Sequence, residues 1–244
     1  MTVYLDPEFA RKLGDNSYHK IAWNLDLIGD RKKVSIFTLE FEVDLRDLGT
    51  RYIPDVAKGW LTARVDGIGR WNLPYQLKVK LTKVTNEREF FTIVEGRLKG
   101  KDANVKLRAD GSSYLLERGI RTEAVQLEYS RSNNIVKLLG TTKEYWAIME
   151  ETGEIPPIPN GTYDLEIPYE PHPGGSYYLR YANRAKTWFK IGHTSDYGHR
   201  FFHTGRVTLG CVTVTQNERW DEVYDYLITS RKDDLSVGTL SIVD

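Results

Sequence analysis

Residues 75–84, YQLKVKLTKV, alternate apolar and polar side chains over most of their length. Leu77, Val79 and Leu81 fall on one side of an extended chain, and polar side chains fall on the other. This two-residue period is typical of a β-strand with one buried face. Further stretches predict strands in the same half of the chain: residues 33–45, 60–65, 90–98 and 103–107. The sequence therefore predicts an antiparallel β domain of unknown role over residues 1–120.

The second half, residues 121–244, continues with short strands and then changes its period. Residues 125–140, VQLEYSRSNNIVKLLG, predict a hairpin. Short strands are expected at TYDLEI (162–167), SYYLRYA (176–182), WFKIG (188–192), RFF (200–202), LGCVTV (209–214) and VGTLSIV (237–243). Apolar side chains at helical spacing in residues 218–228 predict one main helix, and Thr215 with Glu218 fits a capping box before it. The predicted fold class is mainly β, with an accessory β domain followed by a β-rich domain.

Composition excludes several classes of function. Lys plus Arg and Asp plus Glu each number 34, so the net charge is zero and a dedicated nucleic-acid binder is not expected. No apolar run approaches the ~20 residues that span a bilayer, and the first residues lack the pattern of a secretory signal. The single cysteine excludes an intrachain disulfide and a multi-cysteine metal site. No cofactor or metal is implied.

Chemistry concentrates in residues 203–214, HTGRVTLGCVTV. A thiol attacks as the thiolate, so Cys211 needs a base, and His203 can serve if the chain between them folds back. Gly205 permits such a turn, and Gly210 leaves room for a substrate carbonyl beside the sulfur. Backbone N–H groups near Gly210 and Cys211 could hold an oxyanion, and the Thr208 hydroxyl could orient the substrate or the loop.

The pattern of a histidine, then Thr-x-Gly-Cys and an apolar strand, resembles the L,D-transpeptidase (YkuD-like) superfamily. RFFHTG (200–205) and TLGCVT (208–213) are most similar to its branch of type VI secretion effectors that attack peptidoglycan. The hairpin at 125–140 and IPPIPNGTYDL (155–165) look like upstream elements of the same family, in the same order. The resemblance covers about residues 122–244.

The resemblance implies an L,D-transpeptidase-like catalytic domain over residues 121–244, with Cys211 as nucleophile. Its substrates would be peptidoglycan stem peptides, and its activities L,D-transpeptidation, L,D-carboxypeptidation and D-amino-acid exchange. It also implies an antibacterial toxin, made in the cytoplasm and acting in the periplasm after export or injection. Secretion machinery and an immunity protein would then be partners.

Several alternatives stay open at this point. His193 lies eighteen positions before Cys211, a separation that also suits the wider superfamily, so both His193 and His203 are candidate bases, with His203 favoured and His199 third. Arg206 is either a solvated charge or a ligand for a substrate carboxylate.

Departures from the family pattern leave the activity itself open. Leu209 and Thr213 differ from the residues common in the family, so a degenerate module that binds peptidoglycan or a partner protein is an alternative, as is a different thiol amidase of the stem peptide.

Trp188 and Tyr181 are expected in the sheet core, and His172 in an exposed loop.

Overall fold

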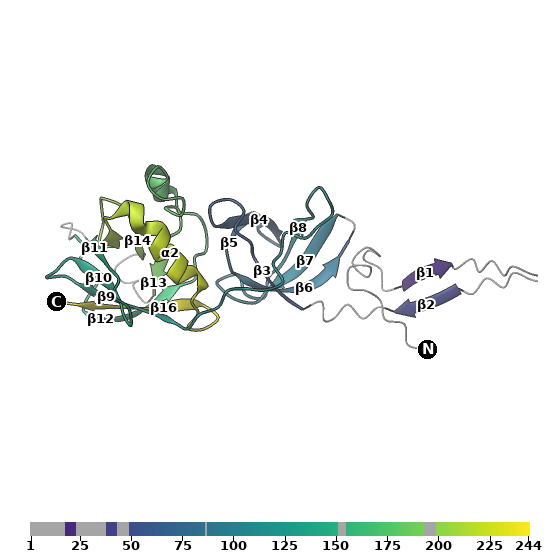
Figure 1. Cartoon of the computed structure of the whole chain (residues 1–244), viewed down its shortest axis with the longest axis horizontal. Coiled ribbons are helices and arrows are strands. Elements are labelled where there is room, and N and C mark those ends of the chain that lie inside the picture. Colours follow the sequence, from purple (N-terminus) through teal and green to yellow (C-terminus); the bar gives the residue numbers. More distant parts are fainter. Residues whose placement is uncertain (1–17, 23–37, 43–48, 86, 151–154, 193–198) are drawn as a thin grey trace, which may run out of the picture.

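The computed structural model describes residues 18–22, 38–42, 49–85, 87–150, 155–192 and 199–244. These residues form a mainly β structure, in which two large sheets lie side by side and a single α-helix covers part of the second (Figure 1). The predicted fold class, mainly β with one main helix, is confirmed. None of the described helices is long and apolar enough to cross a membrane.

The first large sheet has six antiparallel strands in the order β3-β6-β7-β8-β4-β5. Its strands are β3 (Thr50–Tyr52), β4 (Trp60–Val65), β5 (Gly69–Pro74), β6 (Lys78–Val84), β7 (Arg88–Ile93) and β8 (Asp102–Lys106). Leu77, Val79 and Leu81 are buried while Lys80 and Thr82 are exposed, as the two-residue period predicts. A separate hairpin pairs β1 (Tyr18–Ala22) with β2 (Thr38–Glu42), and the rest of the strand predicted at 33–45 lies outside the described residues.

The second sheet closes into an eight-stranded barrel in the order β10-β11-β15-β14-β13-β12-β16-β9. Its strands are β9 (Val125–Ser130), β10 (Ile135–Leu138), β11 (Glu144–Ile148), β12 (Gly161–Glu166), β13 (Phe189–Ile191), β14 (Arg200–Thr204), β15 (Val212–Val214) and β16 (Ser236–Val243). Two pairs are parallel, β14 with β15 and β16 with β9. The helix α2 (Trp220–Thr229) packs on the barrel through Trp220, whose ring meets Phe189 and Phe202.

Two local predictions are wrong. The segment SYYLRYA is not a strand, because the 3-10 helix η2 (Pro173–Tyr178) and turns occupy it. Pro173 fixes a helical start, the His172 ring accepts from Gly174 N, and Gly175 packs so closely on the Ala185 carbonyl that no side chain fits.

The predicted capping box also fails. The 3-10 turn η4 (Asn217–Arg219) leads into α2, and no side chain caps either helix. The Thr215 hydroxyl instead donates to Trp146 O of the neighbouring strand β11 at 3.3 Å.

Ion pairs join the six-stranded sheet to the barrel. The buried carboxylate of Glu95 accepts from Arg121 and Arg231, and Arg97 pairs with Glu166 of β12. Buried apolar side chains from both sheets also form one continuous cluster. The division of the chain at residues 120 and 121 stays a prediction.

Candidate functional site

A parallel pairing brings Cys211 back beside the beginning of β14. Residues 205–211 return the chain so that Phe202 aligns with Val212 and His203 with Thr213. Cys211 therefore comes next to Phe201, whose backbone N–H donates to Cys211 Sγ at 3.4 Å. Side chains aligned across two strands point to the same face of a sheet. His203 and Thr213 thus share a face with Phe201, and Cys211 lies immediately before β15 with its sulfur against the Phe201 backbone.

The returning loop is held by its own contacts. The Thr208 hydroxyl donates to Cys211 O at 2.6 Å, which fixes the peptide plane that follows the thiol. Gly210 adopts φ +76°, where L side chains are strained, and a Cβ there would lie 2.7 Å from Arg200 Nε. A Cβ at Gly205 would lie 3.2 Å from Thr213 Cγ2. Both glycines allow a close approach of the loop to β14 and β15.

His203 is buried, with both ring nitrogens hydrogen-bonded. Nδ1 lies 2.8 Å from Thr204 O, and because a carbonyl only accepts, Nδ1 carries the proton. Nε2 therefore has the lone pair, which accepts from the Thr213 hydroxyl at 3.1 Å. The ring stacks on Trp188 with centroids 3.8 Å apart and planes 12° from parallel. Burial lowers the pKa of His203 to about 4, so the imidazole is neutral at neutral pH.

Cys211 is a buried thiol. Burial raises the pKa of Cys211, against the opposing effects of the Phe201 N–H bond and the positive charge of Arg200. Within the described part of the chain, no histidine nitrogen is hydrogen-bonded to the sulfur. Cys211 therefore lies against β14 near Phe201, while His203, two residues further along β14, bonds to Thr213 and not to the sulfur.

The other predicted site residues take different positions. His193 lies outside the described residues. His199 is exposed immediately before β14. Arg206 is exposed, its backbone N–H donates to Tyr178 Oη at 3.0 Å, and its guanidinium lies 5.5 Å from the ring centroid of Tyr181.

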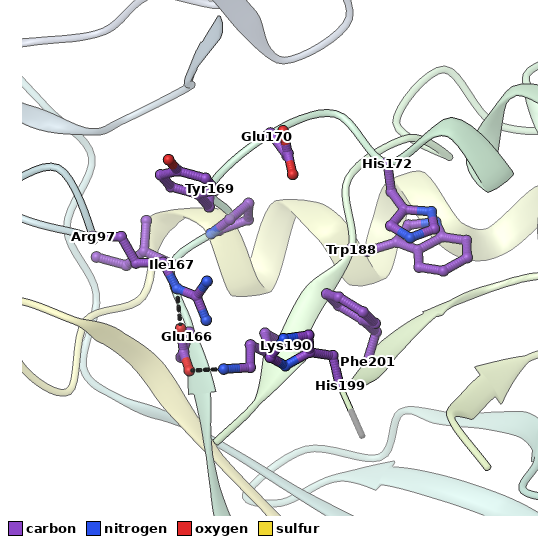
Figure 2. A pocket seen from close by; sticks show the side chains of 11 residues that line it. Arg97, Glu166, Ile167, Tyr169, Glu170, His172, Trp188, Lys190, His199 and Phe201 are labelled. Carbon is purple, nitrogen blue, oxygen red and sulfur yellow. Dashed lines mark hydrogen bonds and ion pairs between the residues drawn. The ribbon is translucent and has the colours of Figure 1, made fainter. Parts of the chain in front are cut away.

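A pocket of about 220 Å³ lies over the same face, on β12, β13 and β14 (Figure 2). Glu166 sits between Arg97 and Lys190 at one end, at 2.7 and 3.3 Å, and His172 stacks on Trp188 at the other. The lining residues are Arg97, Glu166, Ile167, Pro168, Tyr169, Glu170, His172, Trp188, Lys190, His199 and Phe201. Cys211 is absent from this lining, but Phe201, which lines the pocket, is its neighbour on β14.

Sequence reasoning misplaced Trp188, His172 and Tyr181 and missed Arg200. Trp188 is half-buried and lines the pocket rather than the sheet core, held between the rings of His203 and His172. His172 is part of this stack and not an exposed loop residue, and Tyr181 is exposed rather than buried in the core. Arg200 is 4% exposed beside Gly210.

Among the residues that the structure describes, no three His, Cys, Asp or Glu side chains gather into a possible metal site.

Comparisons with known proteins identify no family. No protein-family model matches the chain, and no curated protein matches it. Among solved structures, L,D-transpeptidase 1 of Mycobacterium tuberculosis aligns over 65% of this chain and 91% of its own, with 10% identity and a TM-score of 0.30.

Proposed function

We propose that this chain is a cysteine-dependent acyltransferase that acts on the stem peptides of bacterial peptidoglycan. The observation that supports the chemistry is the contact of the Cys211 sulfur with Phe201 N at 3.4 Å, two residues before His203 on β14. The substrate class comes from the resemblance of residues 200–213 and the upstream elements to L,D-transpeptidases.

The proposed reaction is acyl transfer through a thioester. The Cys211 sulfur attacks the carbonyl carbon of an L-centre residue, and its proton passes to Nε2 of His203. The carbon–nitrogen bond of the substrate breaks, the leaving D-amino acid takes that proton, and the acyl group stays on sulfur. Water then releases a shortened stem peptide, or an amine forms a new peptide bond.

Each neighbouring group has a part in this proposal. The hydrogen bond from Nδ1 to Thr204 O fixes the tautomer that leaves Nε2 basic. The Thr213 hydroxyl is hydrogen-bonded to Nε2 at 3.1 Å. When the thiol ionises, this hydroxyl must therefore rotate away from Nε2 or relay the proton to it. Backbone N–H groups near Gly210 and Cys211 would hold the oxyanion, and Thr208 would keep that backbone in place.

The direct test is to incubate purified muropeptides with the wild-type chain and with Cys211→Ala, and to measure product masses. We expect loss of a terminal D-amino acid, or its exchange when free D-amino acids are added, with the wild type alone. Release of the whole stem peptide would identify a stem amidase instead. Unchanged muropeptides with both proteins would refute the proposal.

A second candidate is a non-enzymatic module that binds peptidoglycan. It is favoured by the burial of the Cys211 thiol and by the absence, in the described part of the chain, of a hydrogen bond from a histidine to its sulfur. The rate of Cys211 alkylation by iodoacetamide across pH separates the two. A rate that levels off near neutrality favours the enzyme, and one that keeps rising through the ordinary thiol range favours the module.

We also propose, from the effector resemblance, that the protein acts in the periplasm of a rival bacterium. Expression with and without an added periplasmic signal tests this. Toxicity that appears only with the signal, and is lost in Cys211→Ala, would support it. Equal toxicity in both compartments, or none in either, would refute it.

A further inference from the structure

Arg200, at the first position of β14, has one edge of its guanidinium without a partner. Its side chain is 4% exposed, and neither Nε nor Nη2 has a hydrogen-bond acceptor among the described residues. A buried donor without an acceptor costs about 1–3 kcal/mol, and more when the group is charged. Such an edge is the arrangement expected where a ligand supplies the missing oxygens.

The two unpaired groups form a matched pair. Nε–H and one Nη–H of a guanidinium are parallel donors, and they fit the two oxygens of a carboxylate. No carboxylate among the described residues accepts a hydrogen bond from this edge. Glu166 is already paired with Arg97 and Lys190, and the Cys211 thiol is protonated when its pKa is raised by burial.

The position of this edge relates it to Cys211. Arg200 lies beside Gly210, the residue before the thiol. An ideal Cβ at Gly210 would lie 2.7 Å from Arg200 Nε and 3.2 Å from its Cζ. The guanidinium therefore lies against the backbone that carries the cysteine, and it is close enough for its charge to act on the sulfur.

We propose that Arg200 binds the carboxylate of a substrate whose acyl group is attacked by Cys211. The edge carries almost no accessible surface, so the adjacent Gly210 turn must shift for a carboxylate to enter. On the proposed function, on which the identity of the ligand rests, the carboxylate is the free C-terminus of the leaving D-amino acid. Arg200 is then the residue that restricts the reaction to stem peptides with a free terminal carboxylate.

The test uses alkylation of Cys211, the only cysteine, so it does not depend on turnover. Iodoacetate carries a carboxylate and iodoacetamide does not, while both place the same reactive carbon on sulfur. We measure the ratio of their rates with the full-length wild type, with Arg200→Gln and with Arg180→Gln. Arg180 is an exposed arginine over the Tyr181 ring and gives the same change in net charge.

In Arg200→Gln we expect the iodoacetate-to-iodoacetamide ratio to fall by about tenfold or more, the value of a charged hydrogen bond. Arg180→Gln should keep the wild-type ratio, and Arg200→Lys should fall between, since it keeps the charge but loses the parallel donors. An unchanged ratio in a folded Arg200→Gln would overturn the proposal.

A second measurement needs no variant. N-acetyl-D-alanine should slow alkylation of the wild type by iodoacetamide, while N-acetyl-D-alaninamide at the same concentration should not. Equal protection by both compounds, or by neither, would overturn the carboxylate site. If muropeptides are not substrates but the acid alone protects, the carboxylate site stands and the proposed reaction fails.

Discussion

Replacement of Gly210 by alanine should destabilise the fold through two separate effects. The first is backbone strain, because φ is +76° and an L side chain there costs about 1–2 kcal/mol. The second is overpacking, because the new Cβ would lie 2.7 Å from Arg200 Nε and 3.0 Å from Ile155 Cγ2. Overpacking of a close contact typically costs about 1–3 kcal/mol more.

Gly140→Ala is the matched control. Gly140 has φ +78°, nearly the value of Gly210, but nothing lies within 4 Å of its ideal Cβ. It therefore carries the backbone strain without the contact. The difference in the free energy of unfolding between the two variants measures the contact of Gly210 with Arg200 and Ile155.

The assay is urea unfolding of wild type, Gly140→Ala and Gly210→Ala, followed by intrinsic tryptophan fluorescence. We expect a loss of about 1–2 kcal/mol for Gly140→Ala and a further 1–3 kcal/mol for Gly210→Ala. Iodoacetamide alkylation of Cys211 should change only in Gly210→Ala. Equal losses in the two variants, with equal alkylation, would refute the close packing of the turn against Arg200.

Three further predictions concern stability. The pKa of His203 is about 4 in the folded chain, below the ordinary 6.5. Between these two pH values the unfolded chain binds a proton that the folded chain does not, so the free energy of unfolding falls as the pH drops from 6.5 to 4. The shifted pKa of His203 contributes about 3 kcal/mol to this fall. In His203→Gln the free energy of unfolding should vary less with pH between 4 and 6.5, and the same slope as in the wild type would contradict the prediction. Glu95→Gln should cost about 3–5 kcal/mol in urea unfolding, because it breaks the buried pairs with two arginines. Lys99→Ala is the control, because it removes an exposed ion pair with Asp234 and should cost less than about 1 kcal/mol. Similar losses of stability in Glu95→Gln and Lys99→Ala would contradict the prediction. Thr208→Val should cost about 1–3 kcal/mol by removing the buried bond to Cys211 O, whereas wild-type stability would show that this bond contributes nothing.

Much of the β structure could be predicted from period alone. Val79 and Leu81 are buried on β6 because alternation places them on one face. The failure at residues 176–182 has a tertiary cause. The aromatic and apolar residues there have strand propensity, but Pro173 and the contact of Gly175 with the Ala185 carbonyl impose a 3-10 helix. A close backbone contact between distant segments leaves no periodic signal in a sequence.

The candidate site also has features that the sequence predicts and features that it does not. The glycines around Cys211 predict a turned-back chain, and the pairing of β14 with β15 agrees with it. The hydrogen bond between His203 and Thr213 depends on the register of two parallel strands, which the sequence does not specify. Arg200 could not be found either, because a charged residue at the start of a strand is ordinarily exposed.

The central claim is that Cys211 forms a covalent acyl-enzyme with a stem peptide. The most direct measurement is the intact mass of the protein, quenched in acid during incubation with a muropeptide that ends in a D-amino acid. The account predicts a mass increase equal to the mass of the muropeptide less that of the free amino acid it releases, removed by hydroxylamine and absent from Cys211→Ala. Turnover of the same muropeptide by Cys211→Ala at the wild-type rate, with no adduct on either protein, would contradict it.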